Sequence, residues 1–379
     1  MTRIPGHILS IAVILVSCVT GPAHAGDGAA GWQAEWEKTL AGAKKEAQVT
    51  VYGAPGLQYQ AVYRDFQKAF PEIKLVSVEG WSTSLLPRIS AERRAERYLA
   101  DVWISGTTTP IITLEPKGIS DPLRPALILP EVKDGSKWWG GKLVYIDRKE
   151  SHTLLFQGNV STGSPVSRNT KLVGSQEVRA YDDLLNPKWK GRVGSLDPRV
   201  PSPATGGIRF LYYSPEVGPK FLSRLYSEMN PLLGTQSRQM TDWLASGKIA
   251  ICIFCGNDVD DAKKQGLPVE EWEDEQLGIK KLSLSAGFGS ISLINRAPHP
   301  NSSKIFVNWL LSREGQASWQ RNVDANSLRI DIPKDTLTDR EKKVPQPGRE
   351  YILTDHHRYL DMEGIKKLVN EALAKSGQR

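Results

Sequence analysis

Residues 48–80 read QVTVYGAPGLQYQAVYRDFQKAFPEIKLVSVEG, and this stretch decides the fold. The β-branched run Val49–Tyr52 predicts a short strand that a turn closes at Gly53-Ala54-Pro55-Gly56. A helix is expected over Gln58–Phe70, which stops at a proline, and Ile73–Val78 predicts a second strand. Strand, helix and strand at this spacing indicate two parallel strands joined by a helix that covers one face of the sheet.

The same rhythm continues along the chain. A charged helix at Ser84–Tyr98 and a strand at Ala100–Ile104 extend the first unit, and the alternation resumes from Tyr181 after several short β runs. The predicted fold class is therefore α/β, with two lobes that each hold a mostly parallel sheet flanked by helices. We expect residues 26–160 and 283–379 in the first lobe, with the C-terminal helices, and residues 161–282 in the second.

The first 25 residues have the pattern of an export signal. Arg3 supplies a positive start, Ile8–Val19 is an apolar run too short to span a bilayer, and Ala23-His24-Ala25 fits a cleavage site. A second interpretation stays open, because Leu15-Val16-Ser17-Cys18 resembles a lipobox in which Cys18 would carry a lipid. Since no later stretch approaches roughly eighteen apolar residues, we expect a periplasmic protein that is soluble or anchored only at Cys18.

Composition limits the classes of function. The chain has 379 residues, which is more than one hydrophobic core usually supports, so two domains are expected. Its formal net charge of +7 is spread along the sequence without a basic block. That distribution argues against nucleic-acid binding and allows only a mild attraction to anionic solutes or to a membrane surface.

Cys252 and Cys255 lie at the end of an apolar run that begins at Ile249. We expect buried free thiols, because residues three apart in an extended strand point to opposite faces. A local disulfide would require the strand to turn at Phe254, and redox or metal chemistry is the least favoured alternative. His356-His357 is expected on a solvated polar face rather than at a metal, since neighbouring side chains diverge.

Five segments, in this order behind an export signal, are typical of one family. The most recognisable is Tyr181–Val193, which reads YDDLLNPKWKGRV. The others are Ala43–Tyr52, Arg93–Val102, Pro298–Asn301 with Phe306–Gln316, and Asn326–Pro333. Together they make the chain similar to the type II periplasmic solute-binding proteins of ABC importers, and in particular to the ferric-ion-binding branch.

This resemblance implies two hinged lobes that close over one small solute and then dock on an ABC permease in the inner membrane. It implies neither enzymatic activity nor a cofactor, and we expect a monomer. Two alternatives stay open, a ligand-sensing subunit for a membrane receptor and an exported hydrolase. The hydrolase is disfavoured because the sequence has no Gly-x-Ser-x-Gly nucleophile elbow.

The candidate solute site lies at the strand ends, since open α/β sheets bind ligands beyond the carboxyl ends of their strands. Glycines there allow close backbone approach, and hydroxyl and guanidinium groups bind anions. The alternative is that these residues are ordinary helix caps and that Arg199 forms a surface salt bridge. The candidates are Ala54, Pro55, Trp81, Ser82, Thr83, Gly106 and Thr107 on the first lobe, and Arg199, Ser202, Thr205, Gly206, Asn257 and Asp258 on the second.

The ferric-binding branch carries two adjacent tyrosines just beyond the strand that matches Ile249–Phe254. Asn257 and Asp258 occupy that place here, so the resemblance favours an organic or phosphorylated anion over a bare ferric ion. Tyr212 and Tyr213 are adjacent, but their helix is expected to pack them into the core. We therefore expect no metal ligands, with ferric-ion binding kept as an alternative.

Overall fold

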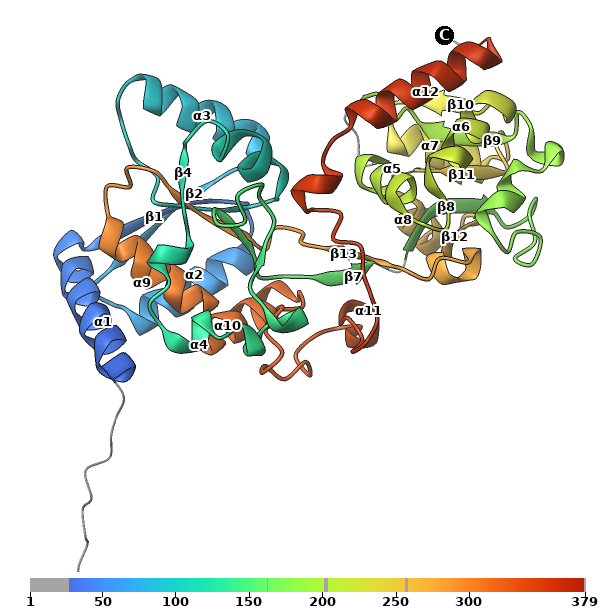
Figure 1. Cartoon of the computed structure of the whole chain (residues 1–379). Helices are drawn as coiled ribbons and strands as arrows, with labels where there is room; N and C mark the ends of the chain where they lie inside the picture. The colour runs from blue at the N-terminus through green and yellow to red at the C-terminus, as the bar shows by residue number, and fades with distance from the viewer. Residues whose placement is uncertain (1–26, 162, 201–203, 256–257, 378–379) are drawn as a thin grey trace, which may run out of the picture.

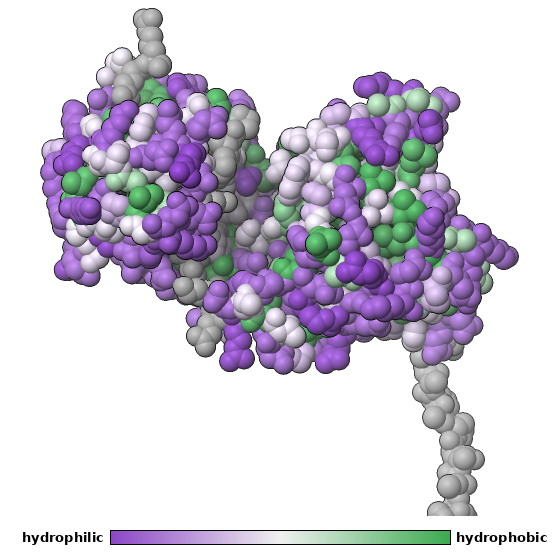
Figure 2. All heavy atoms as spheres, turned by 180° about the vertical axis from the view of Figure 1, so that it is seen from behind, coloured by the Kyte–Doolittle hydropathy of each residue, from purple (hydrophilic) through white to green (hydrophobic). Residues whose placement is uncertain are grey.

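The computed structural model describes residues 27–161, 163–200, 204–255 and 258–377. Two lobes of strands and helices lie side by side in this part of the chain (Figure 1), and a hollow separates them (Figure 2). No helix among these residues combines the length and the apolar character needed to cross a bilayer. The expected export signal and the candidates Ser202 and Asn257 lie outside the described residues.

The first lobe is built on a seven-stranded sheet with the order β2-β1-β3-β14-β6-β5, in which β4 also pairs with β14. β1, β2 and β3 are parallel, and β14 enters antiparallel between β3 and β6. The α/β class predicted from the opening stretch is thereby confirmed. The strands are β1 Gln48–Gly53, β2 Lys74–Glu79, β3 Val102–Ser105, β4 Ser120–Asp121, β5 Val144–Tyr145, β6 Thr153–Leu155 and β14 Ser290–Ile294.

Helices cover both faces of this sheet, and its residues alternate between two cores. Val51 and Val102 belong to the core beneath α2, α9 and α10, whereas Tyr52 and Trp103 belong to the smaller core beneath α3. All four are fully buried, as expected for parallel strands covered on both sides. The helices are α1 Asp27–Glu46, α2 Leu57–Ala69, α3 Ser82–Arg94, α4 Pro130–Lys133, α9 Pro300–Leu311, α10 Arg313–Val323 and α11 Arg340–Lys343.

The second lobe holds a five-stranded sheet with the order β10-β9-β11-β8-β12. β9, β10 and β11 are parallel, and β8 is antiparallel to β11 and to β12. The strands are β8 Gly163–Asn169, β9 Val193–Leu196, β10 Leu232–Gly234, β11 Ile251–Ile253 and β12 Val269–Glu273. The helices are α5 Ala204–Tyr213, α6 Gly218–Glu228, α7 Ser237–Ala245 and α8 Asp258–Lys264. Single helical turns occur at Pro110–Leu114, Arg124–Ala126, Gly135–Lys137, Trp139–Gly141, Tyr181–Leu185, Pro187–Trp189, Asp274–Leu277 and His357–Tyr359.

A small sheet lies between the two large ones. β7 (Asn159–Ser161) pairs antiparallel with β13 (Ser283–Ser285) where the chain passes from one lobe to the other (Figure 1). A third segment, residues 344–362, crosses at the same place, and we call it the C-terminal strap. Ile352 of the strap donates to the Leu282 carbonyl and accepts from the Leu284 amide, both at 2.9 Å, so the strap is hydrogen-bonded along β13.

The strap leads to the last helix, α12 (Glu363–Ser376), which packs on α6 of the second lobe (Figure 1). Ile365, Val369 and Leu373 are buried in the second-lobe core. We expected the C-terminal helices in the first lobe, and for α12 this was wrong. The physical reason is the apolar stripe at four-residue spacing on α12, which is buried against the second lobe.

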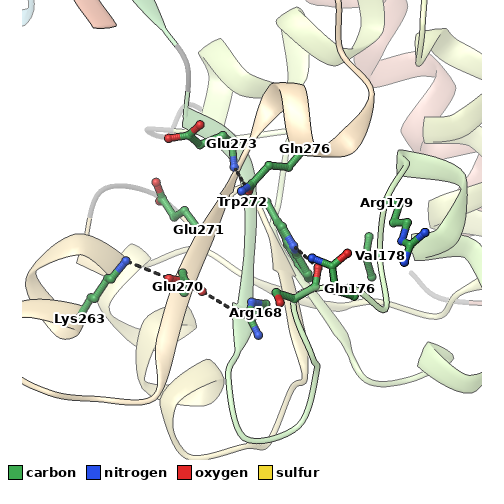
Figure 3. A pocket seen from close by; sticks show the side chains of 11 residues that line it. Arg168, Gln176, Val178, Arg179, Lys263, Glu270, Glu271, Trp272, Glu273 and Gln276 are labelled. Carbon is green, nitrogen blue, oxygen red and sulfur yellow. Dashed lines mark hydrogen bonds and ion pairs between the residues drawn. The ribbon is translucent and has the colours of Figure 1, made fainter. Parts of the chain in front are cut away.

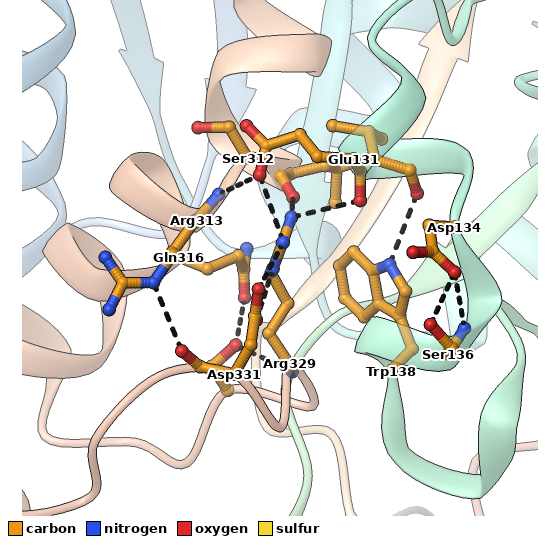
Figure 4. A network of polar contacts seen from close by, with 12 residues as sticks. Glu131, Asp134, Ser136, Trp138, Ser312, Arg313, Gln316, Arg329 and Asp331 are labelled. Atoms are coloured by element: carbon orange, nitrogen blue, oxygen red, sulfur yellow. Dashed lines mark hydrogen bonds and ion pairs between the residues drawn. The ribbon is translucent and has the colours of Figure 1, made fainter.

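Arg329 secures the loop that follows α10. Its side chain is only 1% exposed, and its Nε and Nη2 donate to the two carboxylate oxygens of Asp331 at 2.9 and 2.8 Å. Nη1 donates to the Leu311 carbonyl at 3.0 Å, and Glu131 of α4 lies 3.0 Å from Nη2 (Figure 4). The guanidinium holds the pKa of Asp331 below its usual range. One paired, buried cation therefore links this loop to α4 and to the end of α9.

Candidate functional site

Three loops of the first lobe meet at one edge of its sheet, because β1, β2 and β3 are parallel and end there. The hydroxyl oxygens of Ser82 and Ser105 lie 3.2 Å apart, which joins the loop after β2 to the end of β3. Gly106 then faces the turn before β14, since a Cβ on Gly106 would lie 3.9 Å from the Gly287 carbonyl oxygen. We call this edge, from the loop after β1 to the loop after β3, the first-lobe rim.

The predicted residues on the first-lobe rim differ in what their side chains do. Thr107 Oγ1 donates to Asp355 Oδ1 of the strap at 2.8 Å, so that hydroxyl already has a partner. Trp81, by contrast, is 54% exposed. Of the others, Ala54 is buried, Pro55, Ser82 and Gly106 are half-buried, and Thr83 is exposed.

On the second lobe, Arg199 is paired within its own loop. Its Nε and Nη2 donate to the Asp197 carboxylate at 2.9 and 2.7 Å. Burial acts to raise the pKa of Asp197, but the guanidinium beside it holds that pKa below its usual range. From the sequence, such a salt bridge was the alternative to a solute contact for Arg199. Thr205 and Gly206 lie in the first turn of α5, and Asp258 begins α8, so these candidates follow β9 and β11 as the sequence predicted.

A cavity of about 790 Å³ lies between the lobes. That volume is in the range of sites for small organic ligands. Its walls come from the loop after β3, from α5 and from the C-terminal strap, and Figure 2 shows the hollow between the lobes from behind. The lining residues are Thr108, Ile111, Ile112, Pro116 and Arg148 of the first lobe, Thr205 and Arg209 of α5, and His357, Leu360, Asp361, Met362 and Glu363 of the strap and the start of α12.

Arg209 brings a positive charge into this cavity from the second lobe. Its Nε is buried without a hydrogen-bond partner among the described residues. Burial lowers the pKa of the guanidinium while the charge of Asp355 opposes that shift, and an arginine remains protonated in any case. Because a half-buried, unpaired cation is unfavourable, an anionic group entering the cavity would be stabilised there.

The two histidines of the strap are not on a solvated face, which corrects the sequence-based expectation. His356 is 7% exposed, and burial lowers its pKa to about 4. His357 lines the cavity, and its Nδ1 is buried without a partner in the described part of the chain. The His357 amide donates to the Ile146 carbonyl at 2.9 Å, which pins the strap to the first lobe and explains the burial.

Tyr212 and Tyr213 of α5 pack against other rings. Their ring centroids lie 5.0 Å apart, and Tyr213 lies 5.0 Å from Tyr359 of the strap. Both are half-buried, and Tyr212 contacts the second-lobe core. No group of three or more His, Cys, Asp or Glu side chains within the described ranges is arranged to hold a metal ion.

A disulfide lies at the end of β11. The strand ends at Ile253, and Phe254 has φ of +64°, so the chain turns there. Cys252 and Cys255 thereby come to 5.7 Å between Cα atoms and form a disulfide. The expectation of free thiols was wrong, because the turn that a disulfide requires is present. A Cβ on Gly207 of α5 would lie 3.0 Å from the Phe254 ring, so the turn packs directly on the helix that carries Arg209.

A second hollow, of about 600 Å³, lies beside β8 and β12 on the second lobe (Figure 3). Glu270 forms ion pairs with Lys263 at 3.1 Å and with Arg168 at 2.5 Å, as the dashed lines in Figure 3 mark. Burial raises the pKa of Glu271 to about 7. Because Lys263 and Arg168 are both paired with Glu270, whereas the Nε of Arg209 has no partner among the described residues, this hollow is a weaker candidate than the cavity between the lobes.

Sequence reasoning named Thr205 but missed Arg209, Arg148 and the strap residues of the cavity. A signal for Arg209 was present, because it is the one charged residue in the α5 sequence ATGGIRFLYY. It also follows Thr205 by four residues, which places both on one face of the helix. The strap had no comparable signal, since its role depends on a tail that returns between the lobes.

The chain is similar to binding proteins in fold. AfuA from Actinobacillus pleuropneumoniae, a periplasmic binding protein with fructose-6-phosphate bound, is 18% identical, with 88% of this chain and 99% of that chain covered and a TM-score of 0.53. Apo FutA2 from Synechocystis is 15% identical, with 86% and 98% covered and a TM-score of 0.57. The predicted two-lobed fold is thus that of the periplasmic binding proteins.

Sequence comparison agrees with the fold. An uncharacterized protein from Haemophilus influenzae is 24% identical over 315 residues, which are 80% of this chain and 84% of the relative. The family described as bacterial extracellular solute-binding protein matches residues 48–322. Because this match covers more than half of the 379 residues, the chain belongs to the bacterial extracellular solute-binding proteins.

Proposed function

We propose that this protein is the extracytoplasmic substrate-binding component of an ABC importer and that it captures a small organic anion between its two lobes. The proposal includes export through the signal at residues 1–25, a periplasmic location, and docking of the loaded protein on a permease in the inner membrane. No catalytic step is part of it. Family membership and the two-lobed fold support the general role.

The observation that carries the anionic character of the solute is Arg209. Its guanidinium lies in the cavity between the lobes without an ion pair to any described residue, and its Nε is buried without a partner. Arg148 and the hydroxyl-bearing Thr108 line the same cavity from the first lobe. A solute with a carboxylate, phosphate or sulfonate group would bring an acceptor to these donors.

One of the similar structures has a ligand of the proposed class. AfuA was solved with fructose-6-phosphate bound, which is an organic anion. Asn257 and Asp258 stand where the resemblance to the ferric branch would place adjacent tyrosines, and Tyr213 packs against Tyr359 instead of projecting free. These features favour an organic or phosphorylated anion over a bare ferric ion for this chain.

We further propose that the lobes close by a hinge at the small sheet of β7 and β13. The domain limits expected from the sequence, at 160/161 and 282/283, fall in or beside these two strands. Closure would bring α5 with Thr205 and Arg209 toward the first-lobe rim and bury the solute. The strap is a third connection, and its hydrogen bonds to β13 make it part of the hinge.

Thermal unfolding across a panel of small anions tests the proposed function. The panel holds sugar phosphates, phosphonates, sulfonates, small carboxylates and ferric citrate. A solute that binds only the folded protein stabilises it by about 2.7 kcal/mol at a hundredfold excess over Kd. We expect at least one organic anion to raise the unfolding temperature. A shift with ferric ion alone, or turnover of an added compound without any stabilising solute, would contradict the proposal.

A further inference from the structure

The first-lobe rim carries an aromatic surface that the fold itself does not need. Trp81 stands directly before α3 and is 54% exposed. Its backbone carbonyl accepts hydrogen bonds from the Ser84 and Leu85 amides, both at 2.9 Å, and any residue at this position would supply that carbonyl. The indole Nε1 has no hydrogen-bond partner among the residues that the structure describes. The large side chain is therefore available for contact with something else.

The exposed indole is supported from behind by other rings. Its centroid lies 5.4 Å from that of Phe288, in the turn before β14, and Phe288 lies 6.2 Å edge-on from Tyr59 of α2. Tyr59 in turn lies 5.4 Å from the fully buried Trp319. A row of four rings thus runs from the core of the first lobe to its rim. This packing restricts the orientation of the Trp81 side chain. The side chain therefore loses little further conformational entropy when a ligand binds.

Trp81 lies on the same rim as the first-lobe wall of the interlobe cavity. The next residue, Ser82, contacts Ser105 at 3.2 Å between hydroxyl oxygens. The loop after Ser105 leads through Gly106 and Thr107 to Thr108, which lines the cavity that Arg209 also lines. Two other large apolar side chains are exposed on this rim, Leu57 after β1 and Ile112 after β3. The first-lobe rim thus adds exposed apolar surface beside the cavity, whereas Arg209 of α5 and Arg148 of the first lobe supply positive charge within it.

We propose that Trp81 is a stacking surface for a ring of the solute, while Arg209 binds the charged group of the same solute. This inference rests on the proposed function and narrows its substrate class to ring-bearing organic anions, such as a sugar phosphate or an aromatic phosphate or acid. Flat ring faces stack on an indole through dispersion and apolar contact, and inorganic oxyanions and short acyclic acids have no such face.

The test uses isothermal titration calorimetry with four probes. Fructose 6-phosphate and phenyl phosphate carry a saturated and an aromatic ring, glycerol 3-phosphate is acyclic, and inorganic phosphate is the bare anion. We expect at least one ring compound to bind about tenfold or more tightly than both ringless probes. Which of the two ring compounds binds distinguishes a sugar from an aromatic solute.

Three variants assign the effect to Trp81. We expect Trp81→Ala to weaken binding of the ring compound about tenfold and to leave binding of the ringless probes unchanged. Trp81→Phe should retain most of the affinity, because it keeps a ring in place. Leu172→Ala removes an exposed apolar side chain of the second lobe, 38% exposed, and is the matched control that should change nothing.

Different results would contradict the stacking role of Trp81 and the proposed function. Equal binding of ring and ringless anions, or an unchanged preference in Trp81→Ala, would overturn the stacking role and leave anion capture standing. A Trp81→Ala variant with unchanged solute affinity, in cells that take up less of the solute, would assign the indole to contact with the permease. That result would also overturn the stacking role. Absence of binding by every anion of the wider panel would instead contradict the proposed function.

Discussion

Thr107 of the first-lobe rim donates a hydrogen bond to Asp355 of the C-terminal strap, although 248 residues separate them in the sequence. The second carboxylate oxygen of Asp355 accepts from the Ala286 amide at 2.8 Å, between β13 and β14. One carboxylate therefore ties the rim, the hinge and the strap together. The strap continues from there along the cavity to α12 on the other lobe.

Asp355→Ala removes both of these hydrogen bonds, and we expect the strap to loosen. Each bond to a charged acceptor contributes about 1.5–3 kcal/mol at most, and the Asp355 carboxylate is only half-buried, so the free energy of unfolding should fall by about 1–2 kcal/mol. Urea unfolding measures the change. Thr107→Val removes only one of the two bonds and should lower stability by less. Equal stability of wild type and Asp355→Ala would show that the strap is not held at this point.

Arg329→Met leaves Asp331 and Glu131 without their shared cation. Arg329 is almost fully buried and also donates to the Leu311 carbonyl, whereas the two carboxylates are partly exposed, so we expect the free energy of unfolding to fall by about 2–3 kcal/mol. Arg321→Met is the control, since Arg321 pairs with Asp65 at the surface and its loss should change stability by less than about 1 kcal/mol. Chemical denaturation of both variants decides the matter, and a similar loss in the two would refute the assigned role of Arg329.

Replacing Cys252 and Cys255 together by alanine removes the disulfide at the end of β11. The loop that it closes is only four residues long, so we expect a loss of about 2 kcal/mol from the unfolded-state entropy. Because the turn at Phe254 packs on α5, the variant should also bind the solute more weakly. Full retention of both stability and affinity would show that the disulfide has no part in shaping the site.

Asp274 makes stability depend on pH. It is 1% exposed, and burial raises its pKa to about 8, although the Tyr181 hydroxyl donates to it at 3.1 Å. A carboxyl whose pKa is raised on folding binds its proton more tightly in the folded state than in the unfolded state. Its contribution to the free energy of unfolding therefore falls as pH rises from about 4 to about 8.

Asp274→Asn removes this ionisation and keeps an oxygen that accepts from Tyr181. We expect the variant to gain stability relative to wild type as pH rises, by on the order of 1–3 kcal/mol at pH 8. Urea unfolding at pH 5 and pH 8 gives the difference between the two proteins at each pH. A difference that does not grow with pH would contradict the raised pKa of Asp274.

Local pattern predicted the first lobe well. The alternation of strand and helix from Val49 to Ile104 fixed three parallel strands, since short apolar β runs and a proline stop leave little choice. The same alternation predicted that the first-lobe candidates lie at one edge of the sheet, beyond the carboxyl ends of its parallel strands. The disulfide was considered only as an alternative to free thiols, because it depends on a single left-handed residue, Phe254, whose conformation no propensity indicates.

The cavity could be predicted only in part. Thr205 was found because it opens a helix after a strand, and Arg209 was overlooked one turn later on the same face. The strap was unpredictable for a different reason. Residues such as Asp355 and His357 acquire their contacts only when the tail returns between the lobes, and that route depends on long-range packing of Ile365 and Val369 against α6.

Isothermal titration of the strongest-binding organic anion into wild type and Arg209→Gln tests the central claim most directly. Arg238→Gln, which removes an exposed arginine of α7, is the matched control. The account predicts one solute per chain for wild type and for Arg238→Gln. It predicts a Kd about ten- to hundredfold higher for Arg209→Gln, because a charge-assisted hydrogen bond is lost. Equal affinity of wild type and Arg209→Gln for that anion would contradict it.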